Sequence, residues 1–263
     1  MQHSLNVAIR FVFATAICLW ALLALSTSTW AQGSSGQATQ YPARERKPPQ
    51  KENELGSYLP REASIRLPQR YEVRGGIEAS APSHLSKGET EYRAGRNAAA
   101  VPELRQAVKE SPDSYDSHYL LALTLTETRD FKGAIEEFTK AIALATKDDS
   151  KIVANYNMAN AYFDLGDYQN AADTYKIALQ IDDTLSKVHN NLGLALVGLK
   201  HMSDAAAEFT RAVDLKPKYA EAHYNLGVAY LQSGQKEEAR AQQIILANLD
   251  AQLAAKLDAL LKT

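Results

Sequence analysis

The stretch that decides the fold runs from Ser186 to Tyr219 and reads SKVHNNLGLALVGLKHMSDAAAEFTRAVDLKPKY. Its apolar residues recur every three or four positions, once before and once after a polar turn near Lys200. That spacing is the period of an α-helix, so the stretch predicts two helices that fold back on each other. With a period of 34 residues, the same pattern recurs in the units that begin at Ala81, Tyr115, Ile152 and Ala220.

Aligned in register, the five units place small and large side chains at fixed positions. Position 8 is glycine or alanine, position 20 is always alanine, and position 27 is alanine in the first four units. Position 24 is large in those units, where it is occupied by Leu104, Phe138, Tyr175 and Phe209. Alternating bulky and small groups let neighbouring helices interlock at close range. The fifth unit departs from the pattern with Gln243 and Leu246, and three residues, 149–151, are inserted after the second unit.

The turn inside each unit is expected near position 15, which is occupied by Gly95, Arg129, Gly166, Lys200 and Gly234. Just after it, Asp130 and Asp167 are suited to accept hydrogen bonds from the free N–H groups that begin the second helix. Pro112 and Pro217 fall where the second helix must end. Each unit is therefore predicted to be a helical hairpin.

The repeating residues resemble the tetratricopeptide repeat family, whose 34-residue unit carries small, aromatic, alanine and proline positions in this order. The clearest match is Asn191, Leu192 and Gly193, followed by Ala205, Phe209, Ala212 and Pro217. The resemblance implies an all-α fold, a right-handed superhelical solenoid of antiparallel helix pairs over residues 81–263. The repeats are predicted at 81–114, 115–148, 152–185, 186–219 and 220–250. A capping helix at 251–262, which Asp250 begins, carries a leucine stripe.

The first 31 residues have the pattern of a secretory signal peptide. Arg10 precedes an apolar run from Phe11 to Leu25, and cleavage is predicted after Ala31. The run is shorter than the roughly 20 residues that span a bilayer, although an uncleaved N-terminal anchor is the main alternative. The single cysteine, Cys18, lies inside the leader, so the exported protein is expected to have no disulfide and no thiol chemistry.

Residues 32–80 contain five prolines, a Gly-Ser patch and no sustained apolar period, which predicts a largely disordered linker. They carry eight basic and six acidic residues, whereas residues 81–263 carry 20 and 25, a net charge of −5. A mildly acidic array argues against nucleic acid or an anionic membrane surface as the main partner. The linker is either a plain spacer or contains two short apolar segments, at 55–59 and 65–73, that dock onto another surface. Its arginines at 61, 66, 70 and 74 are interspersed with Leu59, Ile65, Leu67 and Tyr71.

Four histidines share position 4 of their units, namely His84, His118, His189 and His223. Equivalent positions in neighbouring hairpins are about 8–10 Å apart or more, whereas zinc ligands converge at about 2 Å from the metal. These histidines are therefore predicted to fill gaps between helices, with one ring nitrogen exposed, and no metal site is expected. The acid pair Glu136-Glu137 is interpreted as solvated surface. No phosphate-binding glycine loop, GxSxG elbow or other catalytic constellation is present, so the sequence predicts neither an enzyme nor a cofactor.

In tetratricopeptide arrays the first helix of each hairpin lines a concave groove, and the resemblance implies which positions point into it. In this chain those positions give the predicted peptide-binding residues Tyr119, Leu123, Tyr156, Asn157, Asn160, Phe163, Asn191, Leu194, Tyr224, Asn225, Val228 and Leu231. Asn157, Asn191 and Asn225 all occupy position 6, where a solvent-facing amide offers both a donor and an acceptor to the backbone of an extended peptide. The alternative is that these asparagines only satisfy local polar groups.

Charged residues at the groove positions are mainly acidic. These positions hold two bases and five acids, which gives a net charge of −3. The bases are Arg93 and Lys187, and the acids are Glu89, Asp116, Glu127, Asp164 and Glu221. The partner is therefore expected to be a protein segment with basic and apolar residues. Chaperone-binding members of the family clamp a terminal carboxylate with lysine and arginine. That activity is not expected, because Tyr156, Glu221 and Asn225 occupy the positions of three of these cations.

Together these features favour an exported scaffold or adaptor that binds an extended peptide of a partner protein in its groove. It is expected to act as a monomer, secreted or in the periplasm. The alternative is a membrane-tethered structural subunit of a cell-envelope, secretion or pilus-assembly machine, with the uncleaved leader as its anchor and its one contact with the membrane. A dimer contact through the leucine stripe of the capping helix is the alternative to a monomer.

Overall fold

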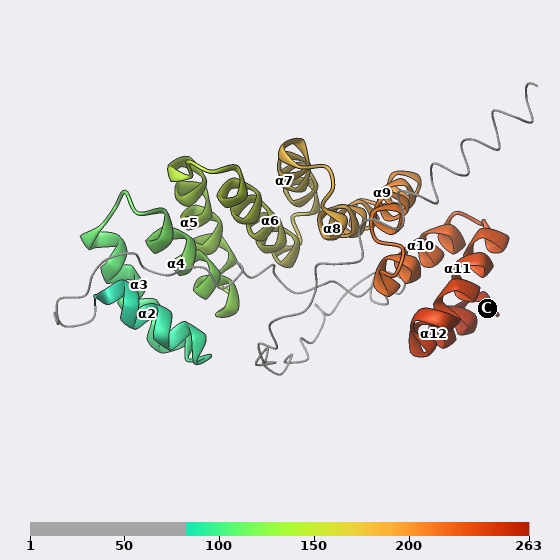
Figure 1. The fold of residues 1–263 in the computed structure, drawn as a ribbon, viewed down its shortest axis with the longest axis horizontal. Coiled ribbons are helices and arrows are strands. Elements are labelled where there is room, and N and C mark those ends of the chain that lie inside the picture. The colour runs from blue at the N-terminus through green and yellow to red at the C-terminus, as the bar shows by residue number, and fades with distance from the viewer. Residues whose placement is uncertain (1–82, 263) are drawn as a thin grey trace, which may run out of the picture. The chain divides into compact units, whose positions relative to one another are not determined.

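Helices make up all the regular structure of the part of the chain that can be described. The computed structural model describes residues 83–262, and every regular element in that range is an α-helix (Figure 1). The predicted leader and the predicted linker at 32–80 lie outside the described residues. Among residues 83–262, no helix combines the length and the apolar composition that crossing a bilayer requires.

The helices alternate between two roles along the chain. The first helices of the pairs are α2 (His84–Arg93), α4 (Tyr115–Glu127), α6 (Asp148–Leu165), α8 (Ser186–Gly198) and α10 (Ala220–Gln232). The second helices are α3 (Asn97–Glu110), α5 (Phe131–Leu144), α7 (Tyr168–Ile181), α9 (Met202–Leu215) and α11 (Lys236–Leu249). One more helix, α12 (Ala251–Leu261), follows α11.

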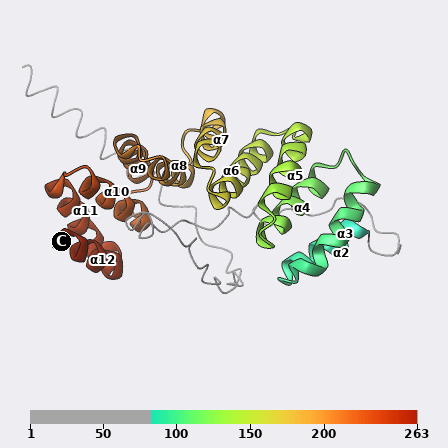
Figure 2. The same cartoon turned by 180° about the vertical axis from the view of Figure 1, so that it is seen from behind.

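Each helix packs mainly against its neighbours in the sequence. A first helix contacts the second helix of its own pair, and that second helix contacts the first helix of the next pair. Figure 2 shows the same succession of helix pairs from behind. Contacts confined to neighbouring units are typical of a solenoid. The prediction of an all-α solenoid of helix pairs is therefore confirmed.

Every hairpin turns at position 15 through a residue with a positive φ. The angles are 73° at Gly95, 67° at Arg129, 87° at Gly166, 63° at Lys200 and 76° at Gly234. This left-handed conformation ends a helix, and it costs about 1–2 kcal/mol more for a residue with a Cβ than for glycine. Two of the five turns therefore carry backbone strain, at Arg129 and Lys200.

Aspartate side chains begin three of the helices, as the sequence predicts. Asp130 begins α5 and accepts a hydrogen bond from the backbone N–H three residues later at 3.1 Å. Asp167 does the same for α7 at 3.2 Å. Asp250 begins α12 and accepts from the N–H groups two and three residues later, at 2.9 and 3.0 Å. Each of these bonds satisfies a backbone donor that has no partner inside its helix, which stabilises the helix by about 1 kcal/mol.

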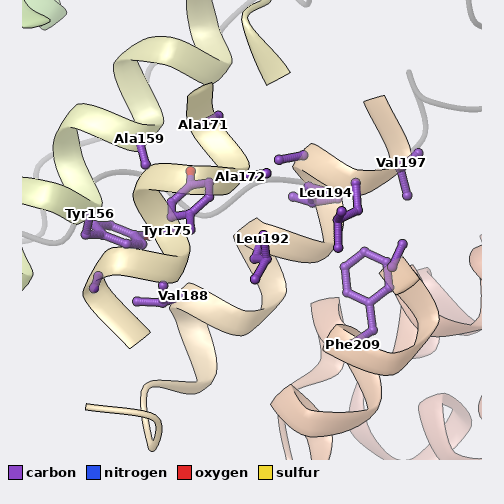
Figure 3. Packing of buried hydrophobic residues seen from close by; sticks show 14 of the residues in the cluster. Tyr156, Ala159, Ala171, Ala172, Tyr175, Val188, Leu192, Leu194, Val197 and Phe209 are labelled. Carbon is purple, nitrogen blue, oxygen red and sulfur yellow. The ribbon is translucent and has the colours of Figure 1, made fainter. Parts of the chain in front are cut away.

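The core consists of large side chains at position 24 seated against small residues on neighbouring helices. The position-24 residues of the first four repeats and all five alanines at position 20 are fully buried. A Cβ added at Gly193 would lie 2.6 Å from a ring carbon of Phe209, so a larger residue there would force the ring to move. Figure 3 shows this packing in the middle of the array, around Tyr156, Tyr175, Leu192 and Phe209.

The three residues inserted after the second repeat lengthen a helix rather than a loop. Helix α6 has 18 residues, whereas α4, α8 and α10 each have 13. The extra turn is at its N-terminus, where Asp148 and Asp149 lie in the first turn. Negative charge at that end interacts favourably with the helix dipole.

Helix α12 covers the end of the array. It packs against both α10 and α11. Leu257 is fully buried and lies directly over Gly227, so it fills the space that a large position-24 residue fills in the other repeats. Leu253, Leu260 and Leu261 pack in the same apolar cluster. The leucine stripe that suggested a dimer contact is therefore used within the chain.

Candidate functional site

The twelve residues predicted to bind a peptide come from one set of helices. We call α2, α4, α6, α8 and α10 the first-helix row, and the twelve residues lie on its last four members. Ten of the twelve side chains are buried, and Phe163 and Leu231 are half-buried.

Side chains at positions 5 and 6 join neighbouring first helices by hydrogen bonds. Each position-6 asparagine donates from Nδ2 to the position-5 side chain of the preceding repeat. The three bonds run from Asn157 to Tyr119 Oη at 2.8 Å, from Asn191 to Tyr156 Oη at 2.9 Å and from Asn225 to Asn190 Oδ1 at 2.9 Å. We call this series the asparagine ladder. Because its members are buried, each bond helps to fix the spacing between two repeats.

Asn160 joins three helices in the middle of the array. Its Oδ1 accepts a hydrogen bond from Tyr175 Oη on α7 at 2.5 Å and one from Asn191 Nδ2 on α8 at 3.1 Å. Asn160 itself lies on α6. Its side chain therefore links the third repeat to the fourth.

The expectation that the position-6 amides face solvent is wrong. Asn157, Asn191 and Asn225 are at most 1% exposed. Neighbouring first helices approach closely enough for side chains 35 to 38 residues apart in the sequence to bond directly. The hydrogen bonds of the ladder agree with the alternative interpretation, in which the asparagines satisfy nearby polar groups. That these residues bind a peptide stays a prediction.

Two acceptors on α10 have no hydrogen-bond partner within residues 83–262. They are Asn225 Oδ1, at the end of the ladder, and Gln232 Oε1. The two residues are seven positions apart, which places them on the same face of the helix. A buried acceptor left unpaired costs about 1–3 kcal/mol. A bound segment that brought N–H groups to these oxygens would recover part of that free energy.

The position-4 histidines form a second periodic set of contacts. Nδ1 of each ring lies 2.5–2.8 Å from the side chain at position 23 of the same repeat. The pairs are His84 with Glu103, His118 with Glu137, His189 with Glu208 and His223 with Gln242. In the last three pairs, Nε2 lies 2.8–3.1 Å from a backbone carbonyl six residues earlier, that of Pro112, Asp183 or Pro217. The prediction of one exposed ring nitrogen is therefore wrong for these three histidines.

His189 faces two acceptors, and its protonated ring can donate to both of them. Burial and the nearby Arg211 act to lower the pKa of His189. Hydrogen bonds to the Glu208 carboxylate and the Asp183 carbonyl outweigh them and raise this pKa above its ordinary value. In the fifth repeat the Gln242 amide replaces the carboxylate, and an amide offers both a donor and an acceptor.

Glu137 shows the same contact from the carboxylate side. Burial acts to raise the pKa of Glu137, but hydrogen bonds from Lys140 and His118 outweigh it and lower the pKa below its ordinary value. The interpretation of Glu137 as solvated surface is therefore wrong, since its side chain is only 13% exposed. The clue in the sequence was the 34-residue recurrence of histidine at position 4 with an acid or amide at position 23.

The histidines hold helices together rather than gather around an ion. Each one contacts a side chain of its own repeat. In the part of the chain that the structure describes, no three histidine, cysteine, aspartate or glutamate side chains lie together as metal ligands do.

The charged residues of the first-helix row leave an excess of negative charge at its N-terminal end. On α2, Arg93 is paired with Glu89 at 2.6 Å. Three further acids, Asp116, Glu127 and Asp164, occupy groove positions of α4 and α6. Glu127 is exposed and the other two are half-buried. This end of the row is suited to a basic ligand.

Comparison with known proteins identifies the family. A family model described as tetratricopeptide repeat matches residues 85–149 and 190–248, and a second model, described as TPR repeat, matches residues 159–200. Together the matches span more than half of the chain and most of the described helices. The chain belongs to the tetratricopeptide repeat family.

Solved structures with a similar fold come from several proteins. MamA from Desulfovibrio magneticus RS-1 is 18% identical with a TM-score of 0.60, over 64% of this chain and 94% of that chain. YrrB, described as a TPR protein with an unusual peptide-binding site, is 17% identical with a TM-score of 0.57, over 67% and 90%. The TPR protein TTC0263 from Thermus thermophilus is 23% identical with a TM-score of 0.51, over 68% and 98%. At these identities the likeness establishes the fold alone. A comparison with curated proteins found no match.

Proposed function

We propose that the protein is a scaffold that binds an extended segment of a partner protein across the first-helix row. The observation that carries the proposal is the asparagine ladder, which ends in Asn225 Oδ1, an acceptor without a partner among residues 83–262. The ladder holds the first helices at a regular spacing, so the row is preorganised for a ligand that runs along it. An extended strand offers a residue about every 3.3 Å, and its N–H groups are the donors that Asn225 and Gln232 lack.

The chemistry of the partner follows from the charges and the apolar residues of the row. Acids outnumber bases at the groove positions, so basic residues in the ligand are favoured. Phe163 and Leu231, the two half-buried members of the predicted set, offer apolar contacts. The description of YrrB, a similar fold with a peptide-binding site, agrees with a peptide ligand.

The proposal includes no catalytic step. Histidine is the side chain best suited to acid–base chemistry near neutral pH. Here His118, His189 and His223 each bond through both ring nitrogens to neighbouring elements of the fold. They are proposed to stabilise the hairpins.

We further propose that the scaffold works after export, with its leader removed at Ala31. The support is the pattern of residues 1–31, in which a basic residue precedes a short apolar run. N-terminal sequencing of the protein from its native host is expected to begin at Gln32. A sequence beginning at Met1 or Gln2 would favour the membrane-tethered alternative.

Charge reversal on the first-helix row tests the binding proposal. Peptides are first selected by display on residues 81–263, and the affinity of one selected peptide is then measured for two variants of equal net charge. Asp164→Lys with Glu221→Lys changes the row, and we expect it to weaken binding by about tenfold or more. Glu136→Lys with Glu237→Lys changes exposed residues of α5 and α11 and is expected to leave binding unchanged.

One substitution of each variant is matched in helix position as well as in charge. Glu221 and Glu237 both lie in the first turn of their helices, so both reversals oppose the helix dipole to a similar extent. Equal weakening by the two variants would show that the peptide does not bind on the first-helix row. Failure of residues 81–263 to select any peptide would refute the proposed function itself.

A further inference from the structure

One face of α10 carries three side chains whose oxygens have no donor among residues 83–262. Glu221, Asn225 and Gln232 are four and seven residues apart, so on an α-helix they lie within about 40° of one another. We call these three residues the α10 stripe. In the described part of the chain, Asn225 Oδ1 and Gln232 Oε1 have no hydrogen-bond partner, and no ion pair or hydrogen bond holds the Glu221 side chain. The stripe therefore offers one carboxylate and two amide oxygens to an incoming donor.

The unpaired oxygen of Asn225 has a cause in the sequence. In the fourth repeat, position 5 is Asn190, which donates from Nδ2 to Oδ1 of its neighbour Asn191 at 3.3 Å. In the fifth repeat the same position is occupied by Tyr224, and Asn225 Oδ1 receives no such bond within residues 83–262. Position 13 is a glycine in the fourth repeat and a glutamine in the fifth. The combination of acceptors therefore distinguishes the fifth repeat from the fourth.

A line of buried amides ends at Asn225. Asn225 donates to Asn190, Asn190 to Asn191, and Asn191 to Asn160, at 2.9, 3.3 and 3.1 Å. All four side chains are buried, and the line runs from the fifth repeat to the third. Hydrogen bonds arranged in one direction polarise each other, so an amide that donates becomes a better acceptor at its oxygen. Asn225 Oδ1 is the acceptor end of this line, and no donor among residues 83–262 reaches it.

The chemistry of the α10 stripe favours a cation with several donors. Residues four apart on a helix have Cβ atoms about 5–6 Å apart, so the side chains of Glu221 and Asn225 are neighbours. A guanidinium has five N–H donors in a planar fork and no acceptor, so it can bond to both side-chain oxygens at once. A lysine ammonium lacks that fork. Glu221 is half-buried and no bond from the described helices holds it, so its side chain can rotate to admit a ligand to the amide of Asn225.

We propose that the α10 stripe binds an arginine side chain of the partner segment, with the guanidinium between Glu221 and Asn225. Gln232 lies about 10 Å further along α10, a distance that three residues of an extended ligand span. Its Oε1 then accepts from a donor about three residues away from the arginine. The inference rests on the proposed function, since it names a side chain of the ligand that the first-helix row binds.

The first experiment pairs a change in the ligand with a change in the stripe. Residues 81–263 contain the apolar clusters of the described fold whole, and a peptide is selected on them by display. Its arginine is replaced by citrulline, which keeps the shape and loses the charge, and the protein carries Glu221→Gln. Each change alone is expected to weaken binding about tenfold. The two together are still expected to weaken it about tenfold, because they remove the same contact.

Glu237→Gln is the matched control for this experiment. Glu237 lies in the first turn of α11 as Glu221 lies in the first turn of α10. It is exposed and outside the first-helix row, so binding is expected to be unchanged. Effects that multiply to about a hundredfold in the double change would show that the arginine binds elsewhere and would overturn the proposal. So would selected peptides in which arginine is not enriched, or in which lysine is enriched equally.

The second experiment separates this inference from the proposed function. The probe is a seven-residue peptide with a central arginine and capped ends, added to residues 81–263 at millimolar concentration, and the side-chain amide signals of Asn225 and Gln232 are followed by NMR. Both signals are expected to shift with this peptide, and much less with its citrulline analogue or in Glu221→Gln. If the signals stay in place while longer selected peptides bind the row, the inference is refuted and the proposed function stands. If they shift as expected while display selects no peptide, the proposed function alone is refuted.

Discussion

Glu208→Gln tests whether the histidine contact of the fourth repeat stabilises the fold through its charge. The carboxylate oxygen of Glu208 lies 2.7 Å from His189 Nδ1, and glutamine at the same place keeps the size and the hydrogen bond. The fifth repeat already has this arrangement, with Gln242 Oε1 at 2.8 Å from His223 Nδ1. The variant therefore removes the charge and retains the shape.

The expected loss follows from the strength of the two kinds of bond. A hydrogen bond to a charged group contributes about 1.5–3 kcal/mol, and one between neutral groups about 0.5–1.5 kcal/mol. The side chains of His189 and Glu208 are 10% and 28% exposed, so solvent screens part of the attraction. We expect Glu208→Gln to lower the free energy of unfolding by about 1 kcal/mol at about pH 6.

The loss is expected to depend on pH in one direction. The pKa of His189 is raised in the folded state, whereas the unfolded chain titrates near the ordinary value of about 6.5. The contribution of the pair is therefore complete below about pH 6.5 and is lost as the pH rises through the folded pKa. The difference between wild type and variant should shrink towards about pH 9, where the imidazole is neutral.

Urea unfolding followed by circular dichroism at several pH values measures both quantities. The reciprocal change, Gln242→Glu, serves as the matched control, because it places a carboxylate at the equivalent contact of the fifth repeat and should raise the free energy of unfolding at about pH 6 by a similar amount. A Glu208→Gln variant that loses as much stability at about pH 9 as at about pH 6 would show that packing, not charge, accounts for the contact. No loss at about pH 6 would show that the pair contributes nothing.

Three further substitutions test the packing and the turns, each by the change in the free energy of unfolding in urea. Gly193→Ala should lose about 1–3 kcal/mol because its Cβ would lie 2.6 Å from the buried ring of Phe209; an unchanged value would mean that the ring moves freely. Lys200→Gly should gain about 0.5–1 kcal/mol, since the residue has a φ of 63°, and a loss would contradict strain at this turn. Leu257→Ala should lose about 2–5 kcal/mol and increase amide exchange in α10, because the side chain is fully buried over Gly227; exchange unchanged there would contradict the role of α12 as a cap.

The repeat period was sufficient to predict the hairpins, because the residues that set it are the ones that touch within and between neighbouring helices. Small residues at position 8, alanines at position 20 and the caps at Asp130 and Asp167 all act over distances of less than one repeat. Replacement of the fifth position-24 residue by Leu257 was not predictable in the same way. That contact depends on where α12 lies, and the repeat pattern ends before it.

The hydrogen bonds of the first-helix row were harder to predict. The period placed Asn157, Asn191 and Asn225 at equivalent sites, but it did not show that each amide bonds to the preceding repeat. That outcome depends on how closely two helices approach and on which side-chain conformation the gap allows. For the histidines, the sequence showed that they recur at position 4, but it did not show that each contacts the side chain at position 23. The partner lies on the other helix of the hairpin, and its distance is fixed only once the hairpin is packed.

Backbone amide chemical-shift mapping of residues 81–263 with a bound peptide tests the central claim most directly. If an extended segment lies across the first-helix row, the shift changes will concentrate on α4, α6, α8 and α10, and the side-chain amide of Asn225 will move with them. Changes concentrated on α5, α7 and α9, or on the ends of the array alone, would contradict binding on this row.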